Sequence, residues 1–431
     1  MTRTASEQVV IVGGGFGGLM AARSLRRTPV RVTLVDRRNF HLFQPLLYQV
    51  ATGGLSPGDI ASPLRHVLKY QKNATVLLAE VTGFDLEKRN VLLRGGERLD
   101  FDYLIVAAGV SHDYFGHDGW GRIAPGLKSV EDAIDIRTRI FLAFEKAERA
   151  VDSEEQEELL TFVVVGGGPT GVELAGALGE IARETLRHDF RRINPGDARI
   201  LLVEGASRIL TSYPELLSRK AQRSLERLGV TVLTNTLVTS VNERSVDIKA
   251  GDNIRSVPAQ TVLWAAGVRG SGLGGILVGN GRSGMDRAGR VLVNPDLSLP
   301  DFPGVFVIGD LAVVNNPGSK PLPGVAPVAM QQGRYVARVI DRTVRRKSPP
   351  APFRYRNYGS MATIGRAAAV ADFGWLRLSG YPAWLAWLFV HLMKLVEFEN
   401  RVLVFIQWAW NYVTKNRGAR LITSEHRSSD R

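Results

Sequence analysis

Short apolar runs recur along the chain, and two of them end in the same glycine-rich pattern. Residues 9–12 and 162–165 are continuous apolar runs, and the turns that follow them read GGGFGG at residues 13–18 and GGGPTG at residues 166–171. A short apolar run bounded by glycine is typical of a fully buried strand, and the small residues after each turn favour a helix. We therefore predict two strand-turn-helix units, about 150 residues apart.

An acidic residue follows each of these units at the same point. Asp36 ends the segment VTLV at residues 32–35, and Glu204 ends the segment ILLV at residues 200–203. In dinucleotide-binding folds the glycines form the tight turn, admit the pyrophosphate and let helix pack on strand, while the acid accepts the ribose hydroxyls. The helix N-terminus adds free N–H groups and a partial positive charge. One such pattern is a weak signal, but two in register predict two dinucleotide sites.

Further strand segments end in small residues. Residues 101–109 and 261–267 both end in Ala-Ala-Gly, which predicts a strand late in each half that passes close to a cofactor. A third segment, at residues 305–310, follows the second half without a glycine-rich turn of its own. We expect this segment to return to the first domain.

The composition changes near residue 380. Residues 355–378 read as short strands, whereas residues 381–396 contain one charged residue, Lys394, and residues 402–414 contain none. One helical face of the first apolar segment carries Trp384, Trp387, Leu388, His391, Leu392 and Leu395. Four of the seven tryptophans lie in these two segments, and the basic residues that follow are Lys415, Arg417, Arg420 and Arg427.

Neither apolar segment reaches the roughly 20 residues of a membrane-spanning helix. Each is better placed in a membrane interface, with its tryptophans at headgroup depth and the basic residues on anionic lipid. The alternative is a pair of amphipathic helices that forms a dimer interface or caps the core, so a homodimer stays open.

The predicted fold is α/β, with two doubly wound Rossmann-like dinucleotide-binding domains and the second inserted in the first. A C-terminal membrane-associating region with two amphipathic helices completes it. The expected boundaries are residues 1–115 for the first domain, 116–268 for the inserted domain, 269–345 for the first domain resumed and 346–431 for the C-terminal region.

Net charge and cysteine content limit the kinds of partner and redox site that the chain can have. The chain has 431 residues, which predicts two or three domains, and a formal net charge of +13, which suits an anionic partner. It has no cysteine, which excludes disulfides, thiolate metal sites, iron–sulfur clusters and dithiol redox chemistry.

The histidines lack metal-site spacing, so we expect no metal, and the basic residues lack nucleic-acid-binding patterns. The first strand leaves no room for a leader, so we expect the catalytic body in the cytoplasm.

With these features the chain resembles the type II NADH dehydrogenases. These are single-subunit NADH:quinone oxidoreductases that do not pump protons. The resemblance covers essentially the whole chain, including the apolar C-terminal helices, which in that family hold the enzyme on the membrane. It is carried by FQPLLYQVATG at residues 43–53, GVELAG at 171–176, VIGD at 307–310 and APVAMQQG at 326–333. The glycine-rich turns alone are shared by the wider two-dinucleotide flavoprotein superfamily.

By that resemblance the first half binds FAD and the second binds NADH. The implied FAD-binding residues are Gly13, Gly14, Gly15, Phe16, Gly17, Gly18, Asp36, Arg37, Val81, Gly109, Asp310 and Ala326. The implied NADH-binding residues are Gly166, Gly168, Gly171, Glu204 and Gly267. A carboxylate at Glu204 accepts two ribose hydroxyls but repels a 2′-phosphate, so NADH is expected to bind better than NADPH. Arg208 is close enough in sequence to soften that preference.

Two residues are the catalytic candidates. In related enzymes the residue at Glu173 lies beside the flavin and contacts the nicotinamide; the alternative is a first-turn acid that complements the helix dipole. The family's glutamine motif usually has glutamine where this chain has Pro327, and proline cannot hydrogen-bond a quinone carbonyl. We therefore expect Gln331 to line the quinone site, with Gln332 as a second candidate.

The expected reaction transfers a hydride from NADH to FAD and two electrons to a membrane quinone, either ubiquinone or menaquinone, at the cytoplasmic face of the cell membrane. Sulfide:quinone oxidoreductase shares this fold but uses cysteines, which this chain lacks. Two alternatives stay open: a soluble NADH-dependent reductase of a ferredoxin-like partner, and a non-catalytic NADH-binding redox sensor.

Overall fold

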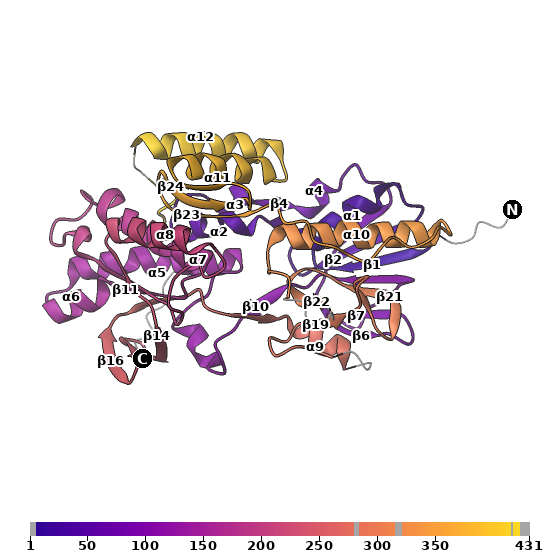
Figure 1. Cartoon of the computed structure of the whole chain (residues 1–431), viewed down its shortest axis with the longest axis horizontal. Helices are drawn as coiled ribbons and strands as arrows, with labels where there is room; N and C mark the ends of the chain where they lie inside the picture. Colours follow the sequence, from indigo (N-terminus) through magenta and orange to yellow (C-terminus); the bar gives the residue numbers. More distant parts are fainter. Residues whose placement is uncertain (1–5, 280–283, 315–320, 415–416, 423–431) are drawn as a thin grey trace. The chain divides into compact units, whose positions relative to one another are not determined.

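The computed structural model describes residues 6–279, 284–314, 321–414 and 417–422. The chain divides into two compact units (Figure 1). The first unit comprises Met1–Leu42, Ala61–Ser111 and Val268–Tyr358, and the second comprises Phe43–Ile60, His112–Gly267 and Gly359–Arg431. The chain therefore leaves the first unit and returns to it, which agrees with the predicted insertion. The exact domain boundaries expected from the sequence stay a prediction.

The first unit is built on a six-stranded sheet in the order β20-β21-β9-β1-β2-β5. Its strands are β1 (Gln8–Val12), β2 (Arg31–Asp36), β5 (Ala74–Leu78), β9 (Tyr103–Val106), β20 (Ser298–Leu299) and β21 (Phe302–Val307). All pairs are parallel except β20 with β21. Val9, Val10 and Ile11 are fully buried, as expected for a strand covered on both faces.

Helices α1 (Phe16–Ser24) and α10 (Ala326–Val344) pack against each other in the first unit. A Cβ at Gly333 would lie 2.3 Å from the Gly17 carbonyl oxygen, so the two backbones can approach only because this residue is glycine. The other elements of this unit are β3 (Phe40–Leu42), β4 (Ala61–Pro63), β6 (Val81–Asp85), β7 (Asn90–Leu93), β8 (Arg98–Asp100), β10 (Val110–His112), β18 (Val268–Gly270), β19 (Val291–Val293), β22 (Ala312–Val314), α4 (Leu64–Val67), α9 (Gly272–Val278), η1 (Leu25–Arg27) and η6 (Gly309–Leu311).

The second unit is built on a four-stranded parallel sheet in the order β13-β12-β11-β17. Its strands are β11 (Thr161–Val165), β12 (Arg199–Val203), β13 (Val230–Leu233) and β17 (Thr261–Trp264). An antiparallel sheet of β14 (Thr236–Val241), β15 (Ser245–Ala250) and β16 (Asn253–Pro258) shares its apolar core. The surrounding elements are α5 (Val130–Arg149), α6 (Ser153–Leu159), α7 (Pro169–Glu180), α8 (Glu215–Arg227), the π-helix η4 (Ile181–Thr185), η3 (Asp118–Arg122) and η5 (Pro195–Asp197).

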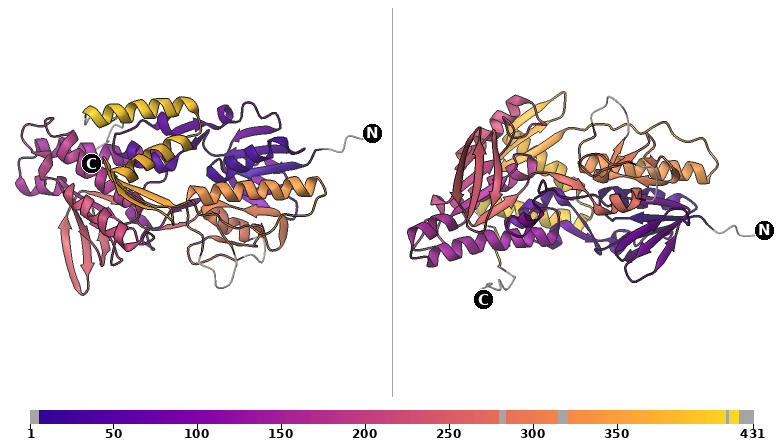
Figure 2. Two further views of the ribbon diagram at one scale, coloured as in Figure 1. Left: turned by 45° about the horizontal axis from the view of Figure 1, so that its top comes forward. Right: turned by 90° about the horizontal axis from the view of Figure 1, so that it is seen from below.

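The C-terminal part of the second unit has the short strands and two amphipathic helices that the sequence predicts. The strands are β23 (Ser360–Gly365), β24 (Ala368–Asp372) and β25 (Arg377–Gly380), and the helices are α11 (Tyr381–Lys394) and α12 (Phe398–Thr414). A Cβ at Gly176 would lie 2.6 Å from the Ile364 carbonyl oxygen, so α7 packs closely on β23. Figure 2 shows α11 and α12 side by side. The short elements η2 (Gln44–Leu46), α2 (Leu47–Ala51) and α3 (Pro57–Ile60) belong to the same unit.

Candidate functional site

The first glycine-rich turn joins β1 to α1, and steric constraints explain why it contains glycines. Gly13 has φ +102°, and a Cβ there would lie 2.5 Å from the Ala107 carbonyl oxygen. A Cβ at Gly18 would lie 1.8 Å from the Gly13 carbonyl oxygen, which is why α1 can pack on β1. At Gly15, the N-cap of α1, the structure describes no atom within 4 Å of such a Cβ. The turn is therefore open where a phosphate would meet the helix N–H groups.

The second turn, between β11 and α7, repeats this geometry. A Cβ at Gly166 would lie 2.8 Å from Ala265 backbone atoms, and one at Gly171 would lie 1.8 Å from the Gly166 carbonyl oxygen. At Gly168, the N-cap of α7, the described residues again leave the Cβ position open within 4 Å. Each unit thus carries one cradle that fits a pyrophosphate.

The two acids contact their turns in the same way. One oxygen of Asp36 accepts the Gly14 N–H at 2.6 Å, and the other accepts the Arg38 N–H at 2.7 Å. One oxygen of Glu204 accepts the Gly167 N–H at 2.6 Å, and the other accepts a backbone N–H two residues further on, at 2.7 Å. A carboxylate has about four acceptor sites, so each acid keeps lone pairs for ribose hydroxyls.

The sheets bring the remaining cofactor candidates to one edge of each unit. In the first unit Asp36 is the last residue of β2, and the turn at Gly13, Gly109 and Asp310 follow the carboxyl ends of the neighbouring strands β1, β9 and β21. In the second unit Glu204, Gly166 and Gly267 follow β12, β11 and β17. Dinucleotides bind at the carboxyl ends of such strands. Of the other candidates, Phe16 begins α1, Gly17 packs beside Ile308, Arg37 is exposed, Val81 begins β6 and is buried, and Ala326 begins α10.

Two residues near the acids support the loops. Arg208 donates to the carbonyl oxygens of Leu210, Thr211 and Tyr213 at 3.1, 2.7 and 2.9 Å, so its guanidinium group stabilises its own loop. The buried His41 is a satisfied loop histidine that supports the first turn: its Nδ1 lies 2.9 Å from the Gly14 carbonyl oxygen.

The carboxyl group of Glu173 is a weaker acid than an ordinary glutamate. It is the fifth residue of α7, beyond the first turn, so the helix-dipole alternative is wrong. Burial raises the pKa of its carboxyl group to about 8, although the Thr363 backbone N–H donates to it and opposes the shift. Burial, and then the charge of Glu173, raise the pKa of both Tyr48 and Tyr213. These three side chains form a group of neutral acids inside the second unit.

The two candidate glutamines of α10, Gln331 and Gln332, both bond to main-chain groups. The Gln331 side chain donates to the Arg356 carbonyl oxygen at 2.9 Å and accepts the Arg356 N–H at 3.0 Å. Gln332 is fully buried, and its side-chain oxygen accepts the Gly309 N–H at 2.6 Å. Pro327 is the second residue of α10, where a missing N–H removes no helical hydrogen bond. The contact of Gln331 with a quinone stays a prediction.

Helix α12 holds the segment Phe43–Ile60, which the sequence did not indicate. Trp408 Nε1 donates to Gln49 Oε1 at 2.7 Å, and Gln49 Nε2 donates to the Tyr48 hydroxyl oxygen at 2.9 Å. Two more side chains of α12 donate to carbonyl oxygens of this segment: Asn400 to Gly58 at 3.3 Å and Asn411 to Gly54 at 3.2 Å. The apolar C-terminal helices therefore position the segment that contains Tyr48.

Arg417 forms a buried ion pair. Its guanidinium group donates to Glu180 at 2.7 Å and to the Thr52 hydroxyl at 2.8 Å. The other carboxylate oxygen of Glu180 accepts the Arg366 N–H. The expectation that Arg417 contacts lipid is wrong, because its side chain is buried against this carboxylate. Arg420 pairs with Asp189, while Lys415 and Arg427 lie outside the described residues.

The amphipathic helices expose an apolar face that includes Trp410 but not Trp387. Trp387 is 1% exposed and stacks on His391 at 4.3 Å, and burial lowers the pKa of His391 to about 4. The expected headgroup position of Trp387 is therefore wrong. The large apolar residues exposed instead are Tyr381, Leu385, Phe389 and Met393 on α11, and Val402, Leu403, Phe405, Ile406, Trp410, Tyr412 and Val413 on α12. We call these residues the apolar face.

No helix in the described part of the chain has both the length and the apolar content to cross a bilayer.

Comparison with known proteins gives matches along nearly the whole chain. Residues 7–333 match the family model described as pyridine nucleotide-disulphide oxidoreductase, and residues 358–415 match the NDH2 C-terminal domain. Two proteins of Mycobacterium tuberculosis named type II NADH:quinone oxidoreductase are 47% and 44% identical to the chain, each over 97% of its length and 90% of theirs.

Solved structures share the fold. NDH2 of Plasmodium falciparum, solved in complex with NADH, matches with a TM-score of 0.85 at 22% identity. The match covers 97% of this chain and 100% of the NDH2 chain. The sulfide:quinone oxidoreductase of Aquifex aeolicus has a TM-score of 0.71 at 17% identity, with 96% of this chain and 92% of that one covered.

Proposed function

The chain belongs to the type II NADH:quinone oxidoreductases, and from that membership we propose the roles of its residues. It is an FAD-dependent enzyme that oxidises NADH with a quinone as acceptor. The observation that carries this function is the 47% identity over 97% of the chain. The soluble reductase and the non-catalytic sensor considered from the sequence are set aside on this ground.

We propose that the first unit holds FAD and the second binds NADH. When bound, FAD accepts a hydride from NADH and passes two electrons to the quinone. The N–H groups at Gly15 and Gly168 would bind the two pyrophosphates, and Asp36 and Glu204 would accept the adenosine ribose hydroxyls. The two open cradles, with an acid bonded to the second glycine of each, support this assignment.

Glu204 favours NADH over NADPH in this proposal. Its carboxylate accepts hydroxyl groups and repels a 2′-phosphate. Arg208, the nearest candidate to offset that repulsion, directs its guanidinium group to three carbonyl oxygens of its own loop. We therefore expect a stronger preference for NADH than the sequence suggested.

Glu173 is the proposed proton carrier on the quinone side of the reaction. Reduction of a quinone to a quinol takes up two protons with the two electrons. A carboxyl group with a pKa of about 8 holds a proton at neutral pH and can release it to an acceptor. We propose that Gln331 lines the quinone site, its amide fixed in one orientation by the main chain of Arg356.

The apolar face of α11 and α12 is proposed to lie in the lipid interface at the cytoplasmic side of the membrane. An amphipathic helix buries such a face at the boundary between headgroups and acyl chains. The eleven exposed apolar side chains, gathered on two neighbouring helices, support this contact. The alternative is that a second copy of the chain covers the apolar face and forms a homodimer.

Steady-state turnover tests the proposed function directly. Purified protein should carry one FAD per chain and should oxidise NADH over many turnovers only when a quinone is added. The rate should follow the quinone concentration to saturation. Protein that contains no flavin, or that oxidises NADH without passing electrons to any quinone, would refute the proposal.

A further inference from the structure

The second unit has a cavity away from its glycine-rich turn. Its volume is about 380 Å³, within the range of small-molecule sites. Arg199, the first residue of β12, lines the cavity, whereas Glu204 directly follows the end of that strand. At about 3.3 Å per residue these two positions lie roughly 17 Å apart. The cavity is therefore separate from the proposed NADH site.

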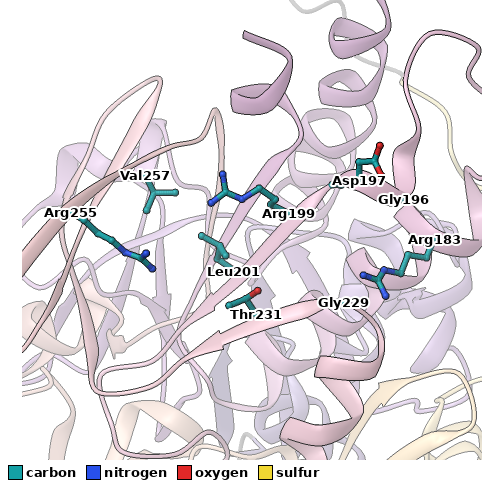
Figure 3. A pocket seen from close by; sticks show the side chains of 10 residues that line it. Arg183, Gly196, Asp197, Arg199, Leu201, Gly229, Thr231, Arg255 and Val257 are labelled. Carbon is teal, nitrogen blue, oxygen red and sulfur yellow. The ribbon is translucent and has the colours of Figure 1, made fainter. Parts of the chain in front are cut away.

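Three arginines from different elements line this cavity (Figure 3). Arg183 comes from the π-helix η4, Arg199 from β12 and Arg255 from β16. In Figure 3 the side chains of Arg183 and Arg255 reach from opposite sides toward Leu201 and Thr231. Converging positive charges repel one another, and a bound anion removes that repulsion.

The positive charge of the cavity is only partly compensated. Arg199 makes an ion pair with Glu157. Within the part of the chain that the structure describes, the side chains of Arg183 and Arg255 make no hydrogen bond or ion pair. The acid that lines the cavity, Asp197, accepts a hydrogen bond from Asn194 at 2.9 Å. Two guanidinium groups therefore keep all their donors for a ligand.

Arg183 lies close against the backbone at Gly229. Gly229 has φ +79°, and a Cβ there would lie 2.0 Å from a guanidinium nitrogen of Arg183. Any side chain at this position would displace the arginine. A side chain held against the backbone loses less freedom when a ligand binds, which favours affinity.

We propose that this cavity binds an organic phosphate. The fork of an arginine matches the oxygens of a phosphate group, which would lie between Arg183 and Arg255. Leu201 and Val257, which are buried side chains of the cavity wall, would contact the apolar part of the ligand, and the Thr231 hydroxyl is a further donor. This inference does not depend on the proposed function.

Calorimetric titration of the FAD-loaded enzyme in saturating NAD⁺ tests the proposal, because the NADH site is then filled. The probes are phenyl phosphate, which has a phosphate and an apolar ring, and inorganic phosphate. Phenyl phosphate should bind once per chain and several-fold more tightly than inorganic phosphate, because the ring is removed from water. Arg183→Gln and Arg255→Gln should each weaken it about tenfold, because each removes one charge-assisted contact.

Arg223→Gln is the matched control, because Arg223 is exposed on α8 of the same unit and does not line the cavity. It should leave the affinity for phenyl phosphate within about twofold, and unchanged turnover should show that all variants fold. No binding of phenyl phosphate, equal affinity for the two probes, or equal weakening by all three substitutions would overturn the proposal.

Discussion

Burial raises the pKa of the Glu173 carboxyl group to about 8, so we expect it to be mostly protonated at neutral pH. In Glu173→Gln the amide cannot release a proton, so we expect quinone reduction to fall by about tenfold to a hundredfold. In the wild type the rate should decline as pH rises through about 8, where the carboxyl group ionises, and the variant should lack this decline. The measurement is the pH profile of kcat, with the exposed Glu215→Gln as control.

The same carboxyl group links stability to pH. Its pKa is about 8 in the folded protein, compared with the ordinary value of 4.5 expected for the unfolded chain. At a pH between these two values the folded state keeps a proton that the unfolded state has released. Stability should therefore fall as pH rises through this window, by at most about 1.4 kcal/mol per pH unit. Thermal unfolding of wild type and Glu173→Gln from about pH 5 to about pH 8 measures this. An equal slope for both proteins would contradict the assignment.

Glu204 gives a second prediction for a single residue. Glu204→Gln loses a charged acceptor, so kcat/KM for NADH should fall by roughly tenfold to a hundredfold. The ratio of kcat/KM for NADH to that for NADPH should fall with it, because the repulsion of the 2′-phosphate is lost. Arg208→Gln should leave the ratio unchanged, since its guanidinium group bonds to loop carbonyls. A ratio that moves with Arg208 and not with Glu204 would contradict this account.

At the scale of elements, the buried ion pair joins Arg417, which follows α12 in the chain, to Glu180 at the end of α7. Arg417→Gln would leave Glu180 buried without its partner, and we expect a loss of about 3 kcal/mol in the free energy of unfolding. Arg420→Gln breaks a pair with Asp189 that is far more exposed and should cost less than about 1 kcal/mol. Denaturant unfolding compares the two. Similar losses for both variants would contradict the structural role of Arg417.

The elements themselves could be predicted from the sequence, because local patterns specify them. The apolar runs and glycine-rich turns predicted β1, β11 and the helices after them, and the acids Asp36 and Glu204 do contact those turns. Side chains whose surroundings come from distant segments could not be predicted. Arg417 was assigned to lipid but pairs with Glu180, 237 residues away.

The two faces of α11 show the same limit. Apolar residues on opposite sides of a helix are alike in sequence, and only the packing against the second unit distinguishes them. Trp387 lies on the buried side and Phe389, two residues on, is 66% exposed. The hydrogen bond between the Gln331 amide and Arg356 likewise depends on the fold, because Arg356 lies 25 residues further along the chain and must be brought back beside α10.

For the molecule as a whole, the apolar face should govern binding to anionic vesicles. Phe405→Asp combined with Ile406→Asp should weaken binding more than about tenfold, because each apolar side chain contributes roughly 1.5–3 kcal/mol when removed from water. Wild-type binding should weaken as salt rises but persist, since salt screens charge and not apolar contact. Co-sedimentation with vesicles measures both effects.

The matched control carries the same substitutions on another surface of the second unit. Leu237 and Ile254 are 60% and 61% exposed, on β14 and β16. Leu237→Asp combined with Ile254→Asp should bind vesicles nearly as the wild type does. If moderate salt abolished wild-type binding, or if the Phe405/Ile406 variant changed the oligomeric state and not vesicle binding, a second copy rather than lipid would cover the apolar face.

Anaerobic titration followed by the visible absorbance of FAD tests the central claim that electrons pass from NADH to a quinone without any cysteine. One equivalent of NADH should bleach the flavin, and one equivalent of a ubiquinone or menaquinone analogue should then restore its absorbance. Flavin that NADH leaves oxidised, or that stays bleached after either quinone is added, would contradict the account.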